Sequence, residues 1–343
     1  MKSGRPKISV LMPVYNGDKH LKKSINSILR QTFDDFELII INDGSTDQSL
    51  SIIESYRDKR IRILNNSKNI GIADSLNRGI NISNGNYIAR QDADDISLPE
   101  RFMCQVNYLK ENDIDLVDAN FAFIDEDDNY IQDYEERIFN PHETLSFLFF
   151  YELVHGAIMC KRSLFMDNNI QYKNRPTEDY DLFIRLAKVG MTVGRISKHL
   201  LKVRKYPNSV SGRNWDTMKK DINQMRIGLV QDLGLQPTDE EKKIHIALVE
   251  QNSAKLCKYK FKDVLWWSNK ITKANEINKI YSSTYFKRQL YLRLIRVIKG
   301  MQKKSILDML KLKNSAELYD ANISLRDLFY IYRTTSNYFI QDK

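Results

Sequence analysis

Short apolar runs alternate with segments of helical periodicity through the first half of the chain. Two of these runs, Ile8–Val14 and Phe36–Asp43, are almost continuously apolar, as expected of parallel strands that are covered on both faces. Residues 60–66 and 85–92 predict two more strands, and Ile72–Ile82 has helical spacing between them. This alternation predicts a doubly wound α/β sheet, in which ligands bind at the carboxyl ends of the strands.

The pattern changes in the second half of the chain. A further strand is expected at Asp115–Asp125, with a hairpin turn in DEDDN, and from about Trp215 onward only helical patterns continue. Residues 1–213 carry a net charge of −1 and residues 214–343 one of +10. We therefore predict an α/β catalytic domain over residues 1–213. Residues 214–343 would form a helical, basic region that contacts an acceptor, a membrane surface or a second subunit.

Composition narrows the class of protein. With 42% hydrophobic and 28% charged residues, the chain has the composition of a soluble globular protein rather than a disordered one. Its three cysteines are widely spaced and odd in number, which predicts no disulfide framework and favours a reducing compartment. We find neither a signal peptide nor an apolar run of about 20 residues, the length that spans a membrane. These features predict a cytoplasmic protein.

Polar clusters follow four consecutive strand patterns, in the sequences YNG, NDGSTD, NNSKNIG and DADD. The last cluster places Asp92, Asp94 and Asp95 within four residues, where their charges repel one another unless a cation binds. Carboxylate oxygens suit Mg²⁺ or Mn²⁺, which keep positions open for substrate phosphates. Because the chain has no GxxxxGK(S/T), and no GxGxxG after its first strand, the phosphates of a nucleotide would need such a metal. A solvated acidic turn is the alternative.

Four segments carry a resemblance to a known family: ISVLMPVYNG, LIIINDGSTD, NIGIADSLNRGI and YIARQDADDISLPERFMCQ. They resemble the family 2 glycosyltransferases, and among these the bacterial enzymes that assemble surface polysaccharides. The resemblance runs from about Ile8 to Gln105 and continues more loosely through HGAIMCKRSLF, TEDYDLFIRLAK and VRKYPNSVS. It implies a GT-A fold, a doubly wound, Rossmann-like mixed sheet, here followed by the C-terminal helical region. It also implies inverting transfer of a sugar from a nucleotide-sugar, usually a UDP-sugar, to a saccharide or lipid-linked saccharide acceptor.

The resemblance also implies roles for individual residues. The donor-binding positions would be Pro13, Tyr15, Asn16, Asp43, Asn69, Gly71, Arg90, Asp92, Ala93 and Asp94. Asp94, with Asp92, would hold Mn²⁺ or Mg²⁺. Asp179 matches the family's catalytic base, and a positioned carboxylate can take the proton of the attacking hydroxyl. Glu178 and His155 would lie on the acceptor side.

Two positions depart from the pattern of many relatives. Leu76 stands where they carry arginine, so Arg78 or Arg90 would have to make any anionic contact there. Tyr206 stands where they carry a histidine proposed to face the metal or the diphosphate. The resemblance therefore does not identify the other ligands of the metal.

Several of these residues also have a purely structural interpretation. Asp43 precedes glycine and could be a turn residue. The pair Glu178–Asp179 could form only the acidic first turn of a helix, and His155 could be a hydrogen-bonded core histidine. His20, His142 and His245 are expected at the surface.

The C-terminal region offers a similar choice. Tyr285–Leu312 contains eight basic residues and Asp308 as its single acid. Its apolar residues at helical spacing are Leu290, Leu294, Val297, Ile298 and Met301. Such a helix can lie peripherally on the anionic inner face of the cell membrane, or it can pack within the protein or on a second subunit. Trp266–Trp267 could likewise anchor at a membrane interface or lie in a core.

Two other functions compete with glycosyl transfer. A phosphatase of the haloacid dehalogenase type also uses a DxD motif, but places it after the first strand of the sheet rather than a later one. A nucleic-acid-binding protein could use the basic C-terminal third electrostatically, although no recognised nucleic-acid motif is present. Neither alternative accounts for polar clusters at four strand ends.

Overall fold

The computed structural model describes residues 4–134, 140–206, 214–250 and 258–300, except for the side chains of 296–300. These residues form two compact units. The first extends to Thr144 and resumes over Glu152–Asp221, and the second comprises Leu145–Tyr151 together with the described residues from Ile222 onward. A short segment from the middle of the sequence therefore belongs with the C-terminal helices. The predicted functional division near residue 213 stays a prediction.

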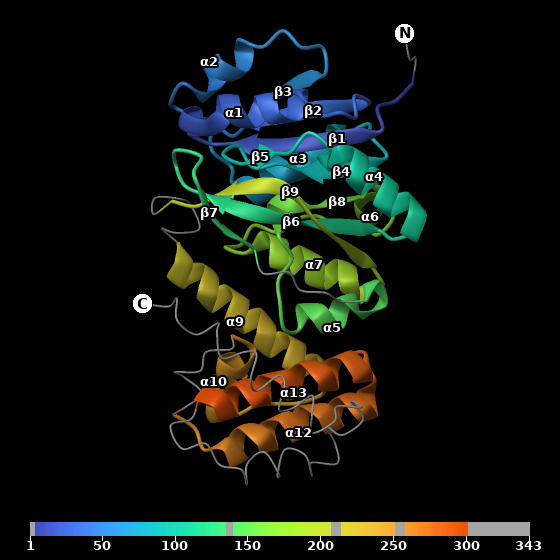
Figure 1. Ribbon diagram of the computed structural model, residues 1–343, viewed down its shortest axis with the longest axis vertical. Helices are drawn as coiled ribbons and strands as arrows, with labels where there is room; N and C mark the ends of the chain where they lie inside the picture. The colour runs from blue at the N-terminus through green and yellow to red at the C-terminus, as the bar shows by residue number, and fades with distance from the viewer. Residues whose placement is uncertain (1–3, 135–139, 207–213, 251–257, 301–343) are drawn as a thin grey trace. The chain divides into compact units, whose positions relative to one another are not determined.

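The first unit is built around a mixed sheet in which nine strands are described (Figure 1). They are β1 (Ile8–Val14), β2 (Phe36–Asn42), β3 (Ile61–Asn65), β4 (Tyr87–Arg90), β5 (Ile96–Ser97), β6 (Leu116–Ile124), β7 (Tyr130–Asp133), β8 (Met159–Lys161) and β9 (Val193–Arg204). The order is β3-β2-β1-β4-β8-β6-β9-β5, with β7 paired to β6. The first four strands are mutually parallel, whereas β8 runs antiparallel to both its neighbours.

Helices cover both faces of this sheet. Those of the first unit are α1 (Asp18–Leu29), α2 (Ser49–Glu54), α3 (Ile72–Ile82), α4 (Arg101–Asn112), α6 (Ser163–Met166) and α7 (Glu178–Lys188), with the 3₁₀ helices η1 (Pro141–Glu143) and η2 (His155–Ala157). On one face, α1 and α4 pack into the core against Val10 and Met12 of β1. On the other, α3 lies so close that a Cβ on Gly79 would be 3.2 Å from Leu11 and 3.1 Å from Ile41. Burial on both faces explains the continuous apolar runs and confirms the predicted doubly wound sheet.

The second unit is helical, as the sequence predicts beyond Trp215. Its helices are α5 (Thr144–Leu148), α9 (Trp215–Asp232, from Ile222), α10 (Asp239–Val249), α12 (Phe261–Asn278) and α13 (Ser283–Gly300). Phe149 lies in a cluster of rings formed by Phe150, His245, Tyr281 and Phe286. His245 is therefore a core residue, and its predicted surface position is wrong. His20, in the first unit, is buried as well.

The structure describes the first part of the predicted amphipathic helix Tyr285–Leu312. Leu290 and Leu294 are fully buried within the second unit, as the packing alternative expected. Val297, Ile298 and Met301 lie outside the described side chains. None of the described helices is both long and apolar enough to cross a membrane.

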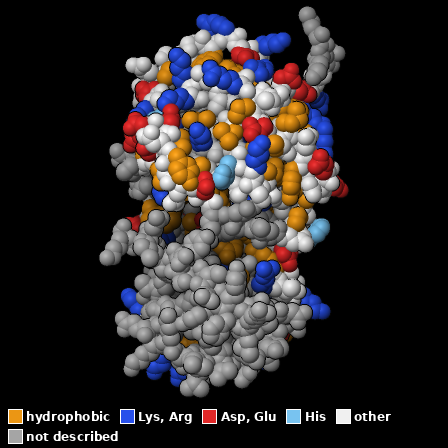
Figure 2. Space-filling model, viewed as in Figure 1, with side chains coloured by type: hydrophobic (Ala, Val, Ile, Leu, Met, Phe, Trp, Pro, Cys, Tyr) orange, Lys and Arg blue, Asp and Glu red, His pale blue; other side chains and the backbone are white. Residues whose placement is uncertain are grey.

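Charged side chains of both signs are interspersed over the face of the first unit seen in Figure 2. This distribution agrees with the net charge of −1 for residues 1–213. The basic excess thus belongs to the C-terminal region rather than to the sheet.

Gly44, after β2, has a positive φ of +67°, and a Cβ there would lie 2.5 Å from the backbone carbon of Lys68. Gly190 provides a control, since its φ is +94° and nothing lies within 4 Å of its Cβ position. We expect Gly190→Ala to cost about 1 kcal/mol, and Gly44→Ala to cost about 1–3 kcal/mol more because of the clash. Thermal unfolding of the two variants measures the difference. Equal losses would show that the close approach at Gly44 contributes nothing.

Candidate active site

Four parallel strand ends lie side by side at one edge of the sheet, because β3, β2, β1 and β4 are neighbours in that order. The predicted donor-binding residues are at these ends: Pro13, Tyr15 and Asn16 at β1, Asp43 after β2, Asn69 and Gly71 after β3, and Arg90, Asp92, Ala93 and Asp94 at β4. The structure thus brings together residues that are up to about 80 positions apart in the sequence. Their contacts with a ligand stay predictions.

Asp43 fixes the loop that follows β3. Its carboxylate is 3% exposed and accepts hydrogen bonds from the Asn66 side chain at 2.7 Å and from the backbone N–H groups of Ile70 and Gly71, each at 2.9 Å. Asp43 therefore has a structural role, but it anchors the loop after β3 instead of serving only as a turn residue. Any hydrogen bond to a base would be made in addition to these three. Asn66 was not predicted individually, although it lies in the polar cluster NNSKNIG.

Asn16 links the loops after β1 and β2. It has a positive φ of 49°, and its side-chain oxygen accepts a hydrogen bond from the Thr46 backbone at 2.8 Å. Its own backbone N–H donates to the Ser45 hydroxyl at 3.1 Å. The neighbouring Tyr15 is exposed, as a side chain that stacks on a ligand would be.

The aspartates after β4 each have a distinct partner. Buried Arg90 donates from Nη2 to Asp92 Oδ1 at 2.7 Å, and the Tyr206 hydroxyl donates to Asp94 Oδ2 at 3.0 Å. Burial, followed by the charge of Asp92, raises the pKa of Asp94. Asp95 is buried and accepts from a backbone N–H of β9, and burial raises its pKa well above the ordinary value. Burial, together with repulsion among Asp92, Asp94 and Asp95, therefore disfavours the charged forms of Asp94 and Asp95.

A divalent cation would relieve this repulsion. In the part of the chain that the structure describes, no three His, Cys, Asp or Glu side chains are arranged to hold a metal ion. Mg²⁺ and Mn²⁺ often use only one or two protein carboxylates and complete their shell with water and phosphate oxygens. Asp92 and Asp94 therefore fit a metal that binds together with a diphosphate, and do not fit a closed structural site.

The acceptor-side residues lie at the start of α7 and on η2. Burial raises the pKa of Glu178 to about 7 and that of Asp179 to about 6, with the Asp179 charge as the second cause for Glu178. One Asp179 oxygen, Oδ1, accepts from the Tyr180 backbone N–H at 2.8 Å. His155 Nδ1 lies 4.0 Å from Glu178 Oε1. The fold thus brings His155 close to Glu178 and to the neighbouring Asp179, although they are more than 20 residues apart in the sequence.

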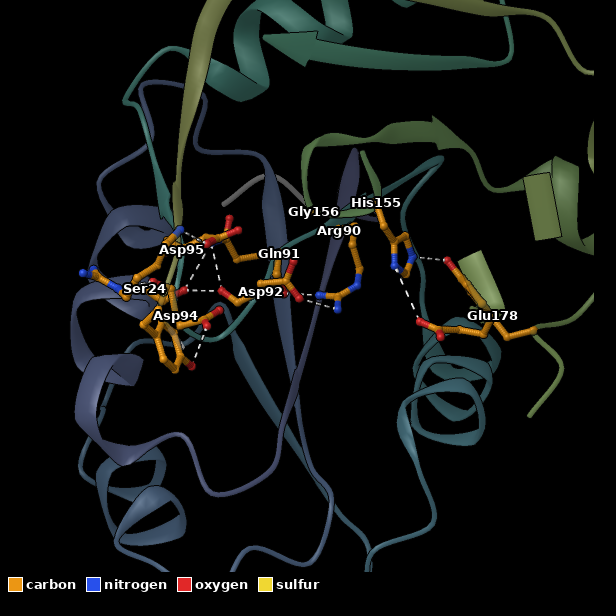
Figure 3. A network of polar contacts seen from close by, with 12 residues as sticks. Ser24, Arg90, Gln91, Asp92, Asp94, Asp95, His155, Gly156 and Glu178 are labelled. Carbon is orange, nitrogen blue, oxygen red and sulfur yellow. Dashed lines mark hydrogen bonds and ion pairs between the residues drawn. The ribbon is translucent and has the colours of Figure 1, made fainter. Parts of the chain in front are cut away.

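The short helix η2 connects the two groups of carboxylates (Figure 3). A Cβ on Gly156 would be 2.6 Å from Asp92 Oδ2, while the preceding residue, His155, faces Glu178. The charge of Asp92 also contributes to the raised pKa values of Glu178 and Asp179. A larger residue at position 156 would have to displace the Asp92 carboxylate, so glycine allows η2 to lie close to the strand-end aspartates.

Comparison with known proteins assigns the family. Residues 9–170 match the family model described as glycosyl transferase family 2. An uncharacterized glycosyltransferase of Methanocaldococcus jannaschii is 37% identical over 206 residues, which cover 58% of this chain and 71% of that protein. An uncharacterized glycosyltransferase of Haemophilus influenzae is 33% identical over 219 residues, covering 60% and 68% respectively. The chain belongs to glycosyl transferase family 2.

This family 2 glycosyltransferase has the predicted GT-A fold. The crystal structure of S. aureus TarS 1–349 matches it with a TM-score of 0.53 and 19% identity, over 98% of this chain and 92% of that one. A structure of the same protein in complex with UDP-GlcNAc matches with a TM-score of 0.53 over 96% and 90%. Membership of the family removes the phosphatase alternative and leaves nucleic-acid binding without support.

The glycosyltransferase site also depends on residues that the sequence did not single out. Fully buried Arg101 donates to the backbone oxygens of Arg90 at 2.7 Å and Gly156 at 3.1 Å, so that it joins β4 to η2. Tyr172 makes a 2.7 Å hydrogen bond with His155 Nε2. No sequence signal pointed to Tyr172, because its partners are brought to it only by the fold.

Proposed function

We propose that the chain is a metal-dependent, inverting glycosyltransferase that moves a sugar from a UDP-sugar to a saccharide or lipid-linked saccharide acceptor in the synthesis of a surface polysaccharide. One observation carries the proposal: Asp92 and Asp94 at the strand ends and Glu178 and Asp179 on α7 converge on either side of η2. The TarS complex with UDP-GlcNAc supports the choice of a UDP-sugar.

In this mechanism Asp179 is the base. The acceptor hydroxyl gives its proton to the Asp179 carboxylate while its oxygen bonds to the anomeric carbon. The bond from that carbon to the diphosphate oxygen breaks on the opposite face, which inverts the configuration. A base whose pKa lies near 6 is ionised at neutral pH and still accepts a proton readily.

Glu178 is suited to a different role from its neighbour. With a pKa of about 7, it is protonated in a large part of the molecules at neutral pH. The protonated carboxyl group can donate a hydrogen bond to an oxygen of the acceptor saccharide. We place it and His155 on the acceptor side. This assignment gives the two adjacent carboxyl groups separate tasks.

On the donor side, Asp92 and Asp94 would hold Mn²⁺ or Mg²⁺. When bound, the ion would neutralise charge on the departing diphosphate. Asp43 keeps the loop that contains Asn69 and Gly71 in place beside the nucleotide. Residues 1–213 would thus hold the donor, the metal and the catalytic base. Both parts of the chain would shape the acceptor site, and residues 214–343 would also provide membrane or oligomer contacts.

For the membrane contact we propose the solvent face of α12. Trp266 is 56% exposed and Ile277 is 71% exposed, and both share this face with Lys262 and Lys273 at helical spacing. Lys270 lies 5.0 Å from the Trp266 ring. Apolar side chains flanked by lysines fit a negatively charged lipid surface.

We expect Trp266→Ala combined with Lys262→Glu and Lys273→Glu to reduce cosedimentation with vesicles containing phosphatidylserine at least tenfold, since each lysine near such a surface contributes about 1 kcal/mol. The control is Trp215→Ala, which removes another exposed tryptophan. Binding of the wild type that is equal on neutral and anionic vesicles, or absent, would rule out this contact.

The function itself is tested by donor turnover. The protein is incubated with UDP-, GDP- and dTDP-sugars and Mn²⁺, and free nucleoside diphosphate is measured with water or added oligosaccharides as acceptor. We expect release of UDP that stops when EDTA is added. Release of no nucleoside diphosphate from any donor would contradict the proposal.

A further inference from the structure

Tyr172 is a buried residue between the donor and acceptor sides of the first unit. It is 6% exposed, and its ring stacks on Phe165 with centroids 6.1 Å apart. Its hydroxyl lies 2.7 Å from His155 Nε2. Burial raises the pKa of the phenol well above its ordinary value, so the hydroxyl keeps its proton and can donate.

The imidazole ring of His155 is uncharged and is held in place by a hydrogen bond. Burial, and then the charge of Arg90, lowers its pKa well below the ordinary value. A neutral imidazole has one N–H and one acceptor nitrogen. If Nε2 accepts from Tyr172, the proton is on Nδ1, the nitrogen that lies 4.0 Å from Glu178 Oε1. The opposite tautomer would turn a lone pair toward Glu178, which is unfavourable when Glu178 is ionised.

The backbone of Tyr172 is tied to the donor side of the site. Asn77, on α3, donates from its side chain to the Tyr172 carbonyl and accepts from the Tyr172 N–H, both at 2.9 Å. Helix α3 begins directly after Gly71, whose N–H is held by Asp43. A continuous series of hydrogen bonds therefore runs from the donor loop through α3 and Tyr172 to His155.

We propose that Tyr172 is a positioning residue that fixes the Nδ1–H tautomer and the plane of His155, directs this N–H toward Glu178, and so couples the acceptor side of the site to α3. The inference rests on the proposed function, because it assigns Glu178 to the acceptor side. Tyr172 acts through His155.

The test is Tyr172→Phe, which removes only the hydroxyl and keeps the ring and the backbone bonds to Asn77. The matched control is Tyr281→Phe in the helical unit, where a buried tyrosine hydroxyl donates to the Leu229 carbonyl at 2.8 Å. Both variants lose one buried hydrogen bond, so their melting temperatures should fall by similar amounts. Only Tyr172→Phe should lower kcat for UDP release, by about tenfold, with KM for the UDP-sugar unchanged within twofold.

A second measurement does not depend on turnover. Nitrogen-15 NMR of the histidine rings should show His155 protonated on Nδ1 in the wild type and in Tyr281→Phe, and altered in Tyr172→Phe. Protonation on Nε2 in the wild type, or unchanged kcat in Tyr172→Phe, would overturn the proposal. A wild type that releases UDP from no donor would count against the proposed function, whereas the ring nitrogens would still report whether Tyr172 fixes His155.

Discussion

The Asp179→Asn variant is expected to lose sugar transfer by about 10²–10⁴-fold while its affinity for the donor stays within twofold of the wild type. The amide has the size of the carboxylate but cannot take the proton of the acceptor hydroxyl. Because Asp179 lies at the first turn of α7 and not at a strand end, the donor positions remain intact. UDP release measures the first effect, and calorimetric titration with UDP measures the second.

Glu178→Gln is the informative comparison for this variant. Glutamine imitates the protonated form of Glu178, which burial already favours at neutral pH. We therefore expect less than a tenfold loss from Glu178→Gln at pH 7. Equal losses in the two variants, or the loss of UDP binding in Asp179→Asn, would show that Asp179 is not the base.

The same assignment fixes the sign of the pH dependence. Acidification protonates Asp179, and because its pKa is raised to about 6, activity should fall as the pH drops through about 6. An unperturbed aspartate would stay ionised to about pH 4. A kcat profile that is flat between pH 7 and pH 5 would contradict a buried base.

The second large effect is expected of Asp94→Asn, which should weaken Mn²⁺-dependent binding of UDP at least 100-fold. Removing a residue that hydrogen-bonds to a metal ligand already lowers metal affinity about 10- to 100-fold. Removing a ligand itself should lower the affinity further. Tyr206→Phe is the control, because it removes the 3.0 Å hydrogen bond to the same carboxylate but keeps the charge. We expect Tyr206→Phe to retain the dependence on Mn²⁺.

Calorimetric titration of UDP with and without Mn²⁺ separates the possibilities. If Asp94→Asn bound UDP and Mn²⁺ as the wild type does, the metal assignment would be wrong. If both variants lost Mn²⁺ dependence equally, the hydrogen bond from Tyr206 rather than the charge of Asp94 would be the important feature.

The sequence predicted the first half of the sheet because its strands are buried on both faces. β1 matches the run Ile8–Val14, and α3 matches the helical spacing of Ile72–Ile82. The polar strand ends were equally visible, since parallel neighbours place their carboxyl ends at one edge. For these elements, the local sequence pattern was enough to predict both the secondary structure and the position of the polar residues.

The remainder was not readable from local pattern. β9 was missed because polar and apolar residues alternate irregularly in VGRISKHLLKVR and its pairing with β6 shifts register twice. The aromatic segment Leu145–Tyr151 joins helices that follow it by more than 70 residues. His245 packs against Phe149 and Tyr172 is hydrogen-bonded to Asn77, and in both cases the partner lies more than 90 residues away in the sequence. Such contacts depend on the whole fold.

We propose that the strand ends bind a nucleoside diphosphate through a metal ion. The most direct measurement is the melting temperature of the wild type with UDP, GDP, dTDP and AMP, each with and without Mn²⁺. We predict a shift with UDP that requires Mn²⁺, corresponding to about 2.7 kcal/mol at 100 times the Kd. No shift with any nucleotide in the presence of Mn²⁺, or an equal shift in its absence, would contradict the claim.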